Sequence, residues 1–225
     1  MDPLTREMID AGAIDVMVAR DAPAVRVLSD AERQESLLRT LAGKPREDVW
    51  LFGYGSLIWN PTVRFDERRV ARVTGWHRAF CLATPAGRGS VDNPGLVLGL
   101  DEGGSCEGVA LRISKEVIEA ELATLWKREM LSTAYVPRWL DLLDREGRKF
   151  GCGIAFTIDR DGEHYAGDLA RDHVIRQLAT AAGALGSSAD YLFRTCEGLR
   201  AHGIPDPDLE RLEAEVIAIH AAEEA

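Results

Sequence analysis

The chain has 225 residues, of which 46% are apolar, so it can bury a sizeable core in one large domain or two small ones. Its formal net charge of -10 argues against a nucleic-acid partner, which needs a basic surface to neutralise phosphates. No segment approaches the run of about 20 apolar residues that a membrane span needs, and the acidic N-terminus lacks a secretory signal, so we expect a soluble cytoplasmic protein with no membrane partner.

The first 28 residues combine weak periodicity with frequent charges, which predicts a segment that is loosely docked or disordered and that tolerates truncation. Ser29-Asp30-Ala31-Glu32 is a capping box that opens a helix, and Gly43 with Pro45 is expected to end it. We therefore divide the chain into an N-terminal extension with a lead-in helix, residues 1–46, and a main domain, residues 47–225.

The apolar run at 49–52 leads directly into Gly53-Tyr54-Gly55-Ser56-Leu57, which predicts a turn of small residues at the end of a buried strand. Glycine and serine keep side chains out of the way there, so consecutive backbone N–H groups can face a small anionic or carbonyl-bearing ligand. The alternative is a tight strand exit in which the two glycines only accommodate positive φ angles.

Residues 49–113 are rich in strand patterns, with runs at 70–74, 78–83, 96–100 and 108–113 between clusters of turn residues. The long loop at 84–95 is dense in Gly and Pro, as expected either of a shaped loop beside a substrate or of an excursion without function.

Helices predominate after residue 113. Ser114 is predicted to cap a helix that runs to about Leu131, and a strand follows at 151–158. Further helices are predicted at 168–183, at 187–203 and from Asp206-Pro207 onwards. Strands and helices do not alternate regularly, so the predicted fold class is α+β: a mixed sheet curled into a small barrel, with inserted helices and a helical C-terminal third.

One carboxylate is out of place in the helix that follows residue 114. Apolar residues step at i, i+4 and i+7 from Ile118, and position i+11 of the same face is Glu129. Because burial disfavours a charged carboxylate, Glu129 is paired with an arginine such as Arg128 or Arg138, emerges into water at the helix end, or is catalytic. Burial would raise its pKa towards neutrality, where one group can both accept and donate a proton.

Cysteine and histidine positions predict neither a disulfide framework nor a metal site. The five histidines have no metal-ligand spacing, and the cysteines stand singly without a Cys-x-x-Cys pair. We expect no structural metal and free, mostly buried thiols at Cys81, Cys106, Cys152 and Cys196.

An ordered set of motifs resembles the ChaC family of γ-glutamylcyclotransferases. The set comprises VWLFGYGSLIWNP at 49–61, Arg88-Gly89-Ser90 with Pro94-Gly95, and LWKREM at 125–130. The resemblance spans roughly residues 47–204 and ends with the pattern Cys196-x-x-Leu199-x-x-x-Gly203-Ile204.

The resemblance implies a mixed α/β fold around a small barrel, making residues 47–225 a γ-glutamylcyclotransferase-like domain. It implies cleavage of glutathione at its γ-glutamyl amide to 5-oxoproline and cysteinylglycine, without metal or cofactor. Residue by residue, Glu129 matches the catalytic glutamate, and Tyr54, Gly55, Ser56 and Leu57 match the substrate-binding turn.

Two tyrosines extend the expected site. Tyr135 resembles the tyrosine that follows the glutamate in related cyclotransferases, and we expect Tyr191 to face the same pocket. Leu96 departs from the family pattern, because a basic residue is expected after the Pro-Gly pair to contact an acidic part of the substrate.

Three alternatives remain open from the sequence. The chain could act on other γ-glutamyl amino acids or amines, since the turn and Glu129 address only the γ-glutamyl half, or it could be a non-catalytic γ-glutamyl-binding regulatory protein. Cys152 could be a nucleophile, although its position inside a strand pattern without a paired histidine favours a buried strand cysteine. The expected partner is a small-molecule substrate, and the sequence leaves the oligomeric state unknown.

Overall fold

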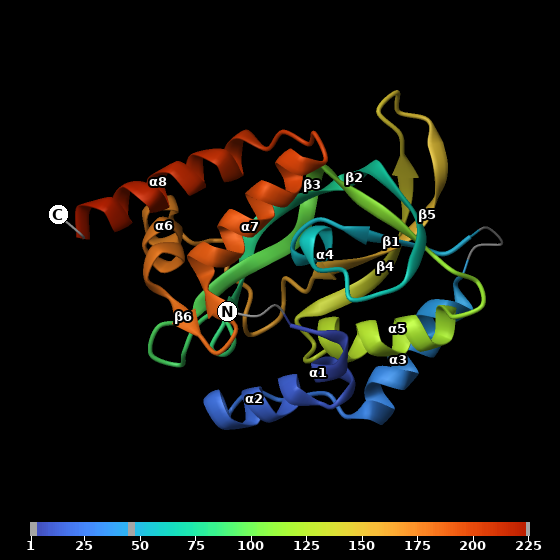
Figure 1. Ribbon diagram of the computed structural model, residues 1–225. Coiled ribbons are helices and arrows are strands. Elements are labelled where there is room, and N and C mark those ends of the chain that lie inside the picture. The colour runs from blue at the N-terminus through green and yellow to red at the C-terminus, as the bar shows by residue number, and fades with distance from the viewer. Residues whose placement is uncertain (1–3, 45–47, 224–225) are drawn as a thin grey trace.

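The computed structural model describes residues 4–44 and 48–223, and its centre is a closed β-barrel (Figure 1). The strands follow the spatial order β1-β3-β2-β4-β5, and a parallel pairing between β1 and β5 closes the barrel. The other neighbours in this order pair antiparallel, and an additional parallel pairing joins β3 to β5. The strands are β1 (Trp50–Gly53), β2 (Phe65–Thr84), β3 (Gly95–Ile113), β4 (Tyr135–Leu143) and β5 (Lys149–Ile158). The mixed barrel confirms the predicted fold class.

The barrel is dominated by one long hairpin. β2 and β3 pair from Phe65↔Ile113 to Thr84↔Gly95, with register shifts at Phe65/Glu67, Thr74/Trp76 and Phe80/Leu82. Such bulges bend a strand and increase its twist, which lets a strand of 20 residues curve around the barrel. The short strands expected within 70–113 are therefore parts of two continuous strands.

Apolar side chains fill the barrel interior. Successive residues of a strand point to opposite faces, and helices cover the outside of the barrel, so apolar residues are buried on both faces of its wall. Fully buried examples are Leu51, Phe52, Leu98, Leu100, Leu111, Ile154 and Phe156.

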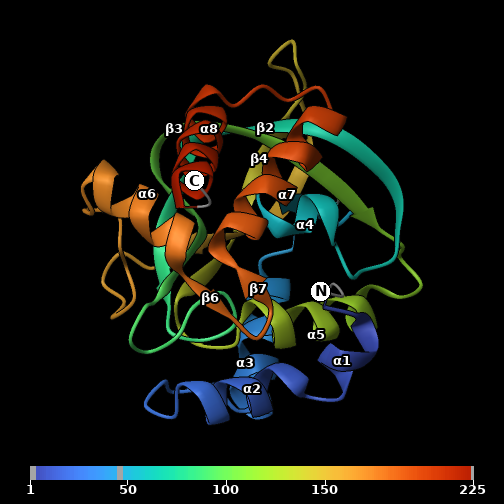
Figure 2. The same cartoon turned by 60° about the vertical axis from the view of Figure 1, so that its left-hand side comes forward.

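Helices cover two opposite sides of the barrel, as Figures 1 and 2 both show. On one side α3 (Asp30–Ala42) packs against α5 (Ile118–Glu129). On the other side α6 (Arg171–Thr180), α7 (Ser188–Ala201) and α8 (Pro207–Glu223) pack against one another. The short strands β6 (Ala182–Gly183) and β7 (Gly186–Ser187) form a separate hairpin between α6 and α7.

Several predicted helix boundaries are confirmed. The capping box at Ser29 and Glu32 is present in both directions, and α3 ends at a Gly43 cap; Pro45 lies outside the described residues. The Ser187 hydroxyl accepts from the N–H of Asp190 at the start of α7. Asp206 Oδ1 accepts from the N–H of Leu209 at the start of α8.

Two predicted helix boundaries are wrong, and one strand was not predicted. Ser114 does not cap α5, which begins at Ile118; its hydroxyl donates to Asp66 instead. The helix expected at 168–183 covers only 171–180, because the chain then enters β6. The segment after Glu129 contains strand β4, which the sequence did not predict because Pro137 interrupts its strand pattern.

The expectation of a loosely docked N-terminus is also wrong. Residues 6–10 form α1 (Arg6–Asp10) and residues 13–21 form α2 (Ala13–Asp21). Their apolar residues Ile9, Ile14 and Val18 form a buried cluster with Ala22 and with Ala86 from the loop at 84–95. This segment is therefore packed against the barrel loops.

Among the described residues, no helix combines the length and the apolar character needed to span a bilayer.

Candidate active site

The predicted small-residue turn joins β1 to the short helix α4 (Ser56–Trp59). Neither Gly53 nor Gly55 has a positive φ, so the alternative explanation of these glycines is wrong. Close packing requires them instead: a Cβ on Gly53 would lie 3.1 Å from Leu57 Cβ, and a Cβ on Gly55 would lie 2.6 Å from the Tyr191 hydroxyl.

Glu129 is the last residue of α5, and its side chain is only 14% exposed. Burial raises its pKa, while the charge of Arg128 acts to lower it. Arg128 Nε lies 2.9 Å from Glu129 Oε1, yet within the described part of the chain this oxygen receives no hydrogen bond of good geometry. The arginine pairing and the burial considered from the sequence therefore both occur, and burial has the larger effect on the pKa.

The guanidinium of Arg128 connects this acid to the turn. Its Nη2 donates to the Ser56 hydroxyl at 2.8 Å, and its Nη1 donates to the Asn60 carbonyl and to the Thr62 hydroxyl. Because the Arg128 side chain is only 8% exposed, these contacts fix the position of α5 relative to the turn.

Three buried phenols surround the turn and the acid. Tyr54 donates to the Phe156 carbonyl at 2.6 Å, and Tyr135 donates to the Leu98 carbonyl at 2.8 Å. Burial raises the pKa of both phenols well above the usual value, so they stay neutral. Burial also raises the pKa of Tyr191, and the Glu129 charge adds to this effect, while contacts with the backbone of Ser56 lower it.

The structure brings together every residue that the sequence placed in the site. A small cavity of about 20 Å³ is lined by Tyr54, Gly55, Ser56, Leu57, Glu129, Tyr135 and Tyr191, with Leu98 and Phe156 completing it. These residues come from the turn after β1 and from α4, β3, α5, β4, β5 and α7, which only the closed barrel brings to one place.

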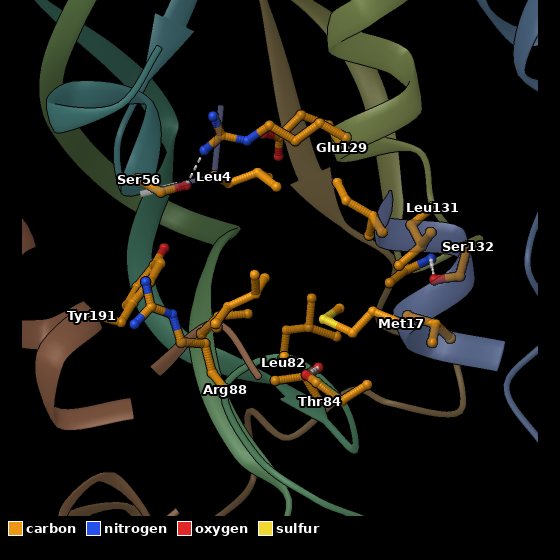
Figure 3. Close-up of a pocket in the computed structure, with 18 of the residues that line it drawn as sticks. Leu4, Met17, Ser56, Leu82, Thr84, Arg88, Glu129, Leu131, Ser132 and Tyr191 are labelled. Atoms are coloured by element: carbon orange, nitrogen blue, oxygen red, sulfur yellow. Dashed lines mark hydrogen bonds and ion pairs between the residues drawn. The ribbon is translucent and has the colours of Figure 1, made fainter. Parts of the chain in front are cut away.

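A larger cavity of about 240 Å³ adjoins the small one (Figure 3). Both cavities share Ser56, Glu129, Tyr135 and Tyr191. Part of the loop at 84–95 also lines the larger cavity, so this loop is one of its walls.

One wall of the larger cavity carries two arginines around a carboxylate. Arg88 Nη1 lies 2.9 Å from Asp190 Oδ2, and Arg194 Nε lies 3.1 Å from Asp190 Oδ1. The Arg88 guanidinium also lies over the Tyr191 ring, 5.7 Å from its centroid. These groups can neutralise an acidic part of a ligand.

Sequence reasoning did not identify Arg194 or the N-terminal wall of the larger cavity, which includes Leu4 and Met17. It treated Arg88 only as part of a motif and Asp190 only as a helix cap. The spacing of Asp190 and Arg194, four residues apart on one helix, was the available signal for their pairing.

Leu96 does not contact either cavity. Its side chain is fully buried, and its N–H donates to the Ser188 hydroxyl at 3.1 Å. The basic residue expected after the Pro-Gly pair is therefore absent from the site, and Arg88 is the nearest basic side chain of the same loop that lines the larger cavity.

Cys152 lies on β5, is partly exposed, and lines neither cavity. Its Sγ lies 3.3 Å from Asp141 Oδ1, and burial raises the pKa of its thiol. The expectation of a buried position is wrong for this cysteine, and its surroundings do not activate it as a nucleophile. Within the described ranges, no group of three or more His, Cys, Asp or Glu side chains is placed to hold a metal ion.

A closed barrel with a glycine turn and one desolvated acid defines a protein with a small-molecule site suited to acid–base chemistry. The family model described as ChaC-like protein matches residues 49–219. The chain therefore belongs to the ChaC-like family, as the motifs predicted.

Relatives agree with this assignment. A protein of Escherichia coli K12 named glutathione-specific γ-glutamylcyclotransferase is 43% identical over 82% of this chain and 80% of its own length. A zebrafish (Danio rerio) protein named glutathione-specific γ-glutamylcyclotransferase 1 is 30% identical over 79% of this chain and 92% of its own length. A crystal structure of a yeast γ-glutamyl cyclotransferase specific to glutathione aligns with a TM-score of 0.69 at 20% identity, over 76% of this chain and 97% of its own, which shows a shared fold.

Proposed function

We propose that this chain is an enzyme that cleaves glutathione at its γ-glutamyl amide, releasing 5-oxoproline and cysteinylglycine. The observation that carries the proposal is the desolvated carboxyl of Glu129, which shares one small cavity with the glycine turn. The family membership and the names of the relatives support the substrate.

The reaction needs no protein nucleophile, because the γ-glutamyl group carries its own α-amine. Attack of this amine on the γ-carbonyl closes a five-membered ring, and well-aligned closures of this kind reach effective molarities of about 10⁵ M or more. The protein must hold the folded conformation, remove a proton from the amine and supply a proton to the departing amide nitrogen.

Glu129 performs both proton transfers in this proposal. Its raised pKa lets the carboxylate accept a proton from the α-ammonium group and then donate one to the leaving nitrogen. The second proton that the attacking nitrogen loses on becoming the lactam N–H protonates the released amine, so neither Glu129 nor the reaction gains or loses a net proton. Arg128 keeps the carboxylate aimed at the turn and limits the rise in its pKa.

The turn supplies the hydrogen-bond donors. The Ile58 N–H donates to the Gly55 carbonyl, so the amides of Ser56 and Leu57 at the start of α4 are the donors proposed for the γ-glutamyl α-carboxylate or for the developing oxyanion. Tyr54 and Tyr135 fix this arrangement through hydrogen bonds to barrel carbonyls. The Tyr191 hydroxyl lies so close to Gly55 that it leaves no room for a Cβ there.

We also propose a cytoplasmic location. The described cysteines are all free, as expected in a reducing compartment.

The direct test is incubation of the purified full chain with glutathione, followed by mass-spectrometric detection of 5-oxoproline. Glu129→Gln preserves the shape of the side chain but removes its proton transfer, so we expect kcat to fall by about 10²- to 10⁴-fold. Glu119→Gln is the matched control, because Glu119 is an exposed residue in the first turn of the same helix. Near-normal turnover by Glu129→Gln would eliminate this assignment, and glutathione binding without product would favour the non-catalytic alternative.

Comparison of glutathione with γ-glutamyl-alanine then defines the substrate class. A clear preference for glutathione supports the proposed activity, whereas equal rates would indicate a cyclotransferase for γ-glutamyl amino acids in general.

A further inference from the structure

The N-terminal segment, residues 4–28, forms one wall of the larger cavity. Leu4, Met17 and Val25 line this cavity, and Figure 3 shows Met17 across the hollow from Tyr191 and Arg88. The segment lies outside residues 49–219, which the family model matches. A part of the chain that the family pattern does not include thus contributes to the site.

Buried ionic contacts hold this wall in place. Arg6 pairs with Glu121, whose side chain is only 2% exposed and also accepts from the N–H of Arg64. Asp15 accepts from both terminal nitrogens of Arg33 at 2.7 and 2.9 Å, and Arg33 is 4% exposed. Charges this deeply buried are costly unless they are paired, so the segment is bound firmly to α3 and α5.

A further contact joins the wall directly to the glycine turn. Asn60, from the Trp-Asn-Pro motif that follows α4, donates from Nδ2 to the Leu4 carbonyl at 2.9 Å. The Asn60 carbonyl accepts from Arg128, which contacts Glu129. The wall, the turn and the acid therefore belong to one connected structure.

The sizes of the two cavities determine which part of a substrate meets this wall. A volume of about 20 Å³ accommodates little more than one water-sized group, so the small cavity can take only the end of a γ-glutamyl group. Because Ser56 and Glu129 line both cavities, the remainder of the substrate, including the leaving amine, must extend into the larger one.

The larger cavity is lined by two kinds of group. Leu4, Met17 and Val25 supply apolar side chains from the N-terminal segment, with Met17 across the hollow from Arg88 (Figure 3). Arg88 and Arg194, which share the carboxylate of Asp190, supply a net positive charge. A leaving group that combines an apolar or thiol-bearing side chain with a carboxylate fits these two kinds of group, and a small polar amine does not.

We infer that the N-terminal segment selects the leaving group, with Met17 as a specificity-determining residue for γ-glutamyl peptides whose second residue is apolar or thiol-bearing. The inference rests on the proposed function. Met17 contacts no reacting atom in this scheme; it favours binding of the part of the substrate beyond the scissile bond.

The test compares Met17→Glu with Met8→Glu in the full chain. Met8 belongs to the same segment but is 40% exposed and lines neither cavity, so it controls for an added charge. Met17→Leu retains an apolar side chain and should therefore bind glutathione as the unmodified chain does. Circular dichroism and the thermal midpoint verify that each variant is folded.

We expect Met17→Glu to raise the KM for glutathione by about tenfold or more, because it replaces an apolar contact with a charge, and to leave kcat near that of the unmodified chain. Inhibition by L-glutamate, which carries the glutamyl half alone, should not change. Met8→Glu and Met17→Leu should keep a normal KM.

An unchanged KM in folded Met17→Glu, or an equal rise in KM for Met8→Glu, would overturn the inference while leaving the proposed function intact. Absence of 5-oxoproline from the unmodified chain would overturn the proposed function and, with it, this inference.

Discussion

Replacement of Gly55 by alanine is the most direct test of how the turn is packed. A Cβ at this position would lie 2.6 Å from the Tyr191 hydroxyl, and the next nearest atoms are in the Leu98 side chain at 3.5 Å. One atom therefore causes the entire overlap. Removing that atom in Tyr191→Phe would leave the new methyl group only ordinary van der Waals contacts.

The structure gives the expected magnitude. Tyr191 is only 7% exposed and packs edge-on against Trp59 and Phe80, so it cannot move away freely. Overpacking at such a site typically costs about 1–3 kcal/mol. For a chain of this size, a loss of about 2 kcal/mol lowers the thermal midpoint by roughly 4–8 °C.

A double-mutant cycle measures this coupling. We expect Gly55→Ala to destabilise the protein in the unmodified background and to cost less than about 0.5 kcal/mol in the Tyr191→Phe background. Gly43→Ala is a matched control, because a Cβ there meets nothing closer than 3.6 Å. Chemical unfolding with a common m-value provides the free energies. The same penalty for Gly55→Ala in both backgrounds would refute the reasoning.

Two further predictions concern stability. Burial raises the pKa of Glu129 in the folded state, so ionisation of this group destabilises the fold as pH rises above its unfolded pKa of about 4.3. Glu129→Gln should therefore have a higher thermal midpoint than the unmodified chain at pH 7, with the difference shrinking towards pH 4; a difference independent of pH would contradict this. Deletion of residues 1–28 should lower the free energy of unfolding by at least about 2 kcal/mol, because it removes the cluster around Ile14, exposes Ala86 and Leu131 that pack against it, and removes Arg6 from the buried Glu121. Equal unfolding midpoints for the full and shortened chains in urea would show that this segment adds no stability.

The sequence determined those features that depend on neighbouring residues. The apolar run before Gly53, the capping box at Ser29 and the stripe that begins at Ile118 each fix a local structure within a few residues. Because Glu129 continues that stripe, helical periodicity placed it on the inward face of the helix, and the structure decided between burial and emergence into water.

Only the tertiary structure decided what lies opposite these features. The bulge at Thr74/Trp76 looks like a strand end in the sequence, because a bulge breaks the two-residue alternation while the strand continues. The charged N-terminus looked unstructured because its partners are remote: Arg6 meets Glu121, 115 residues away. Pairing with buried charges makes this segment a wall of the site. Closure of the barrel brings the Tyr191 hydroxyl close to Gly55. No local sequence pattern records either of these long-range contacts.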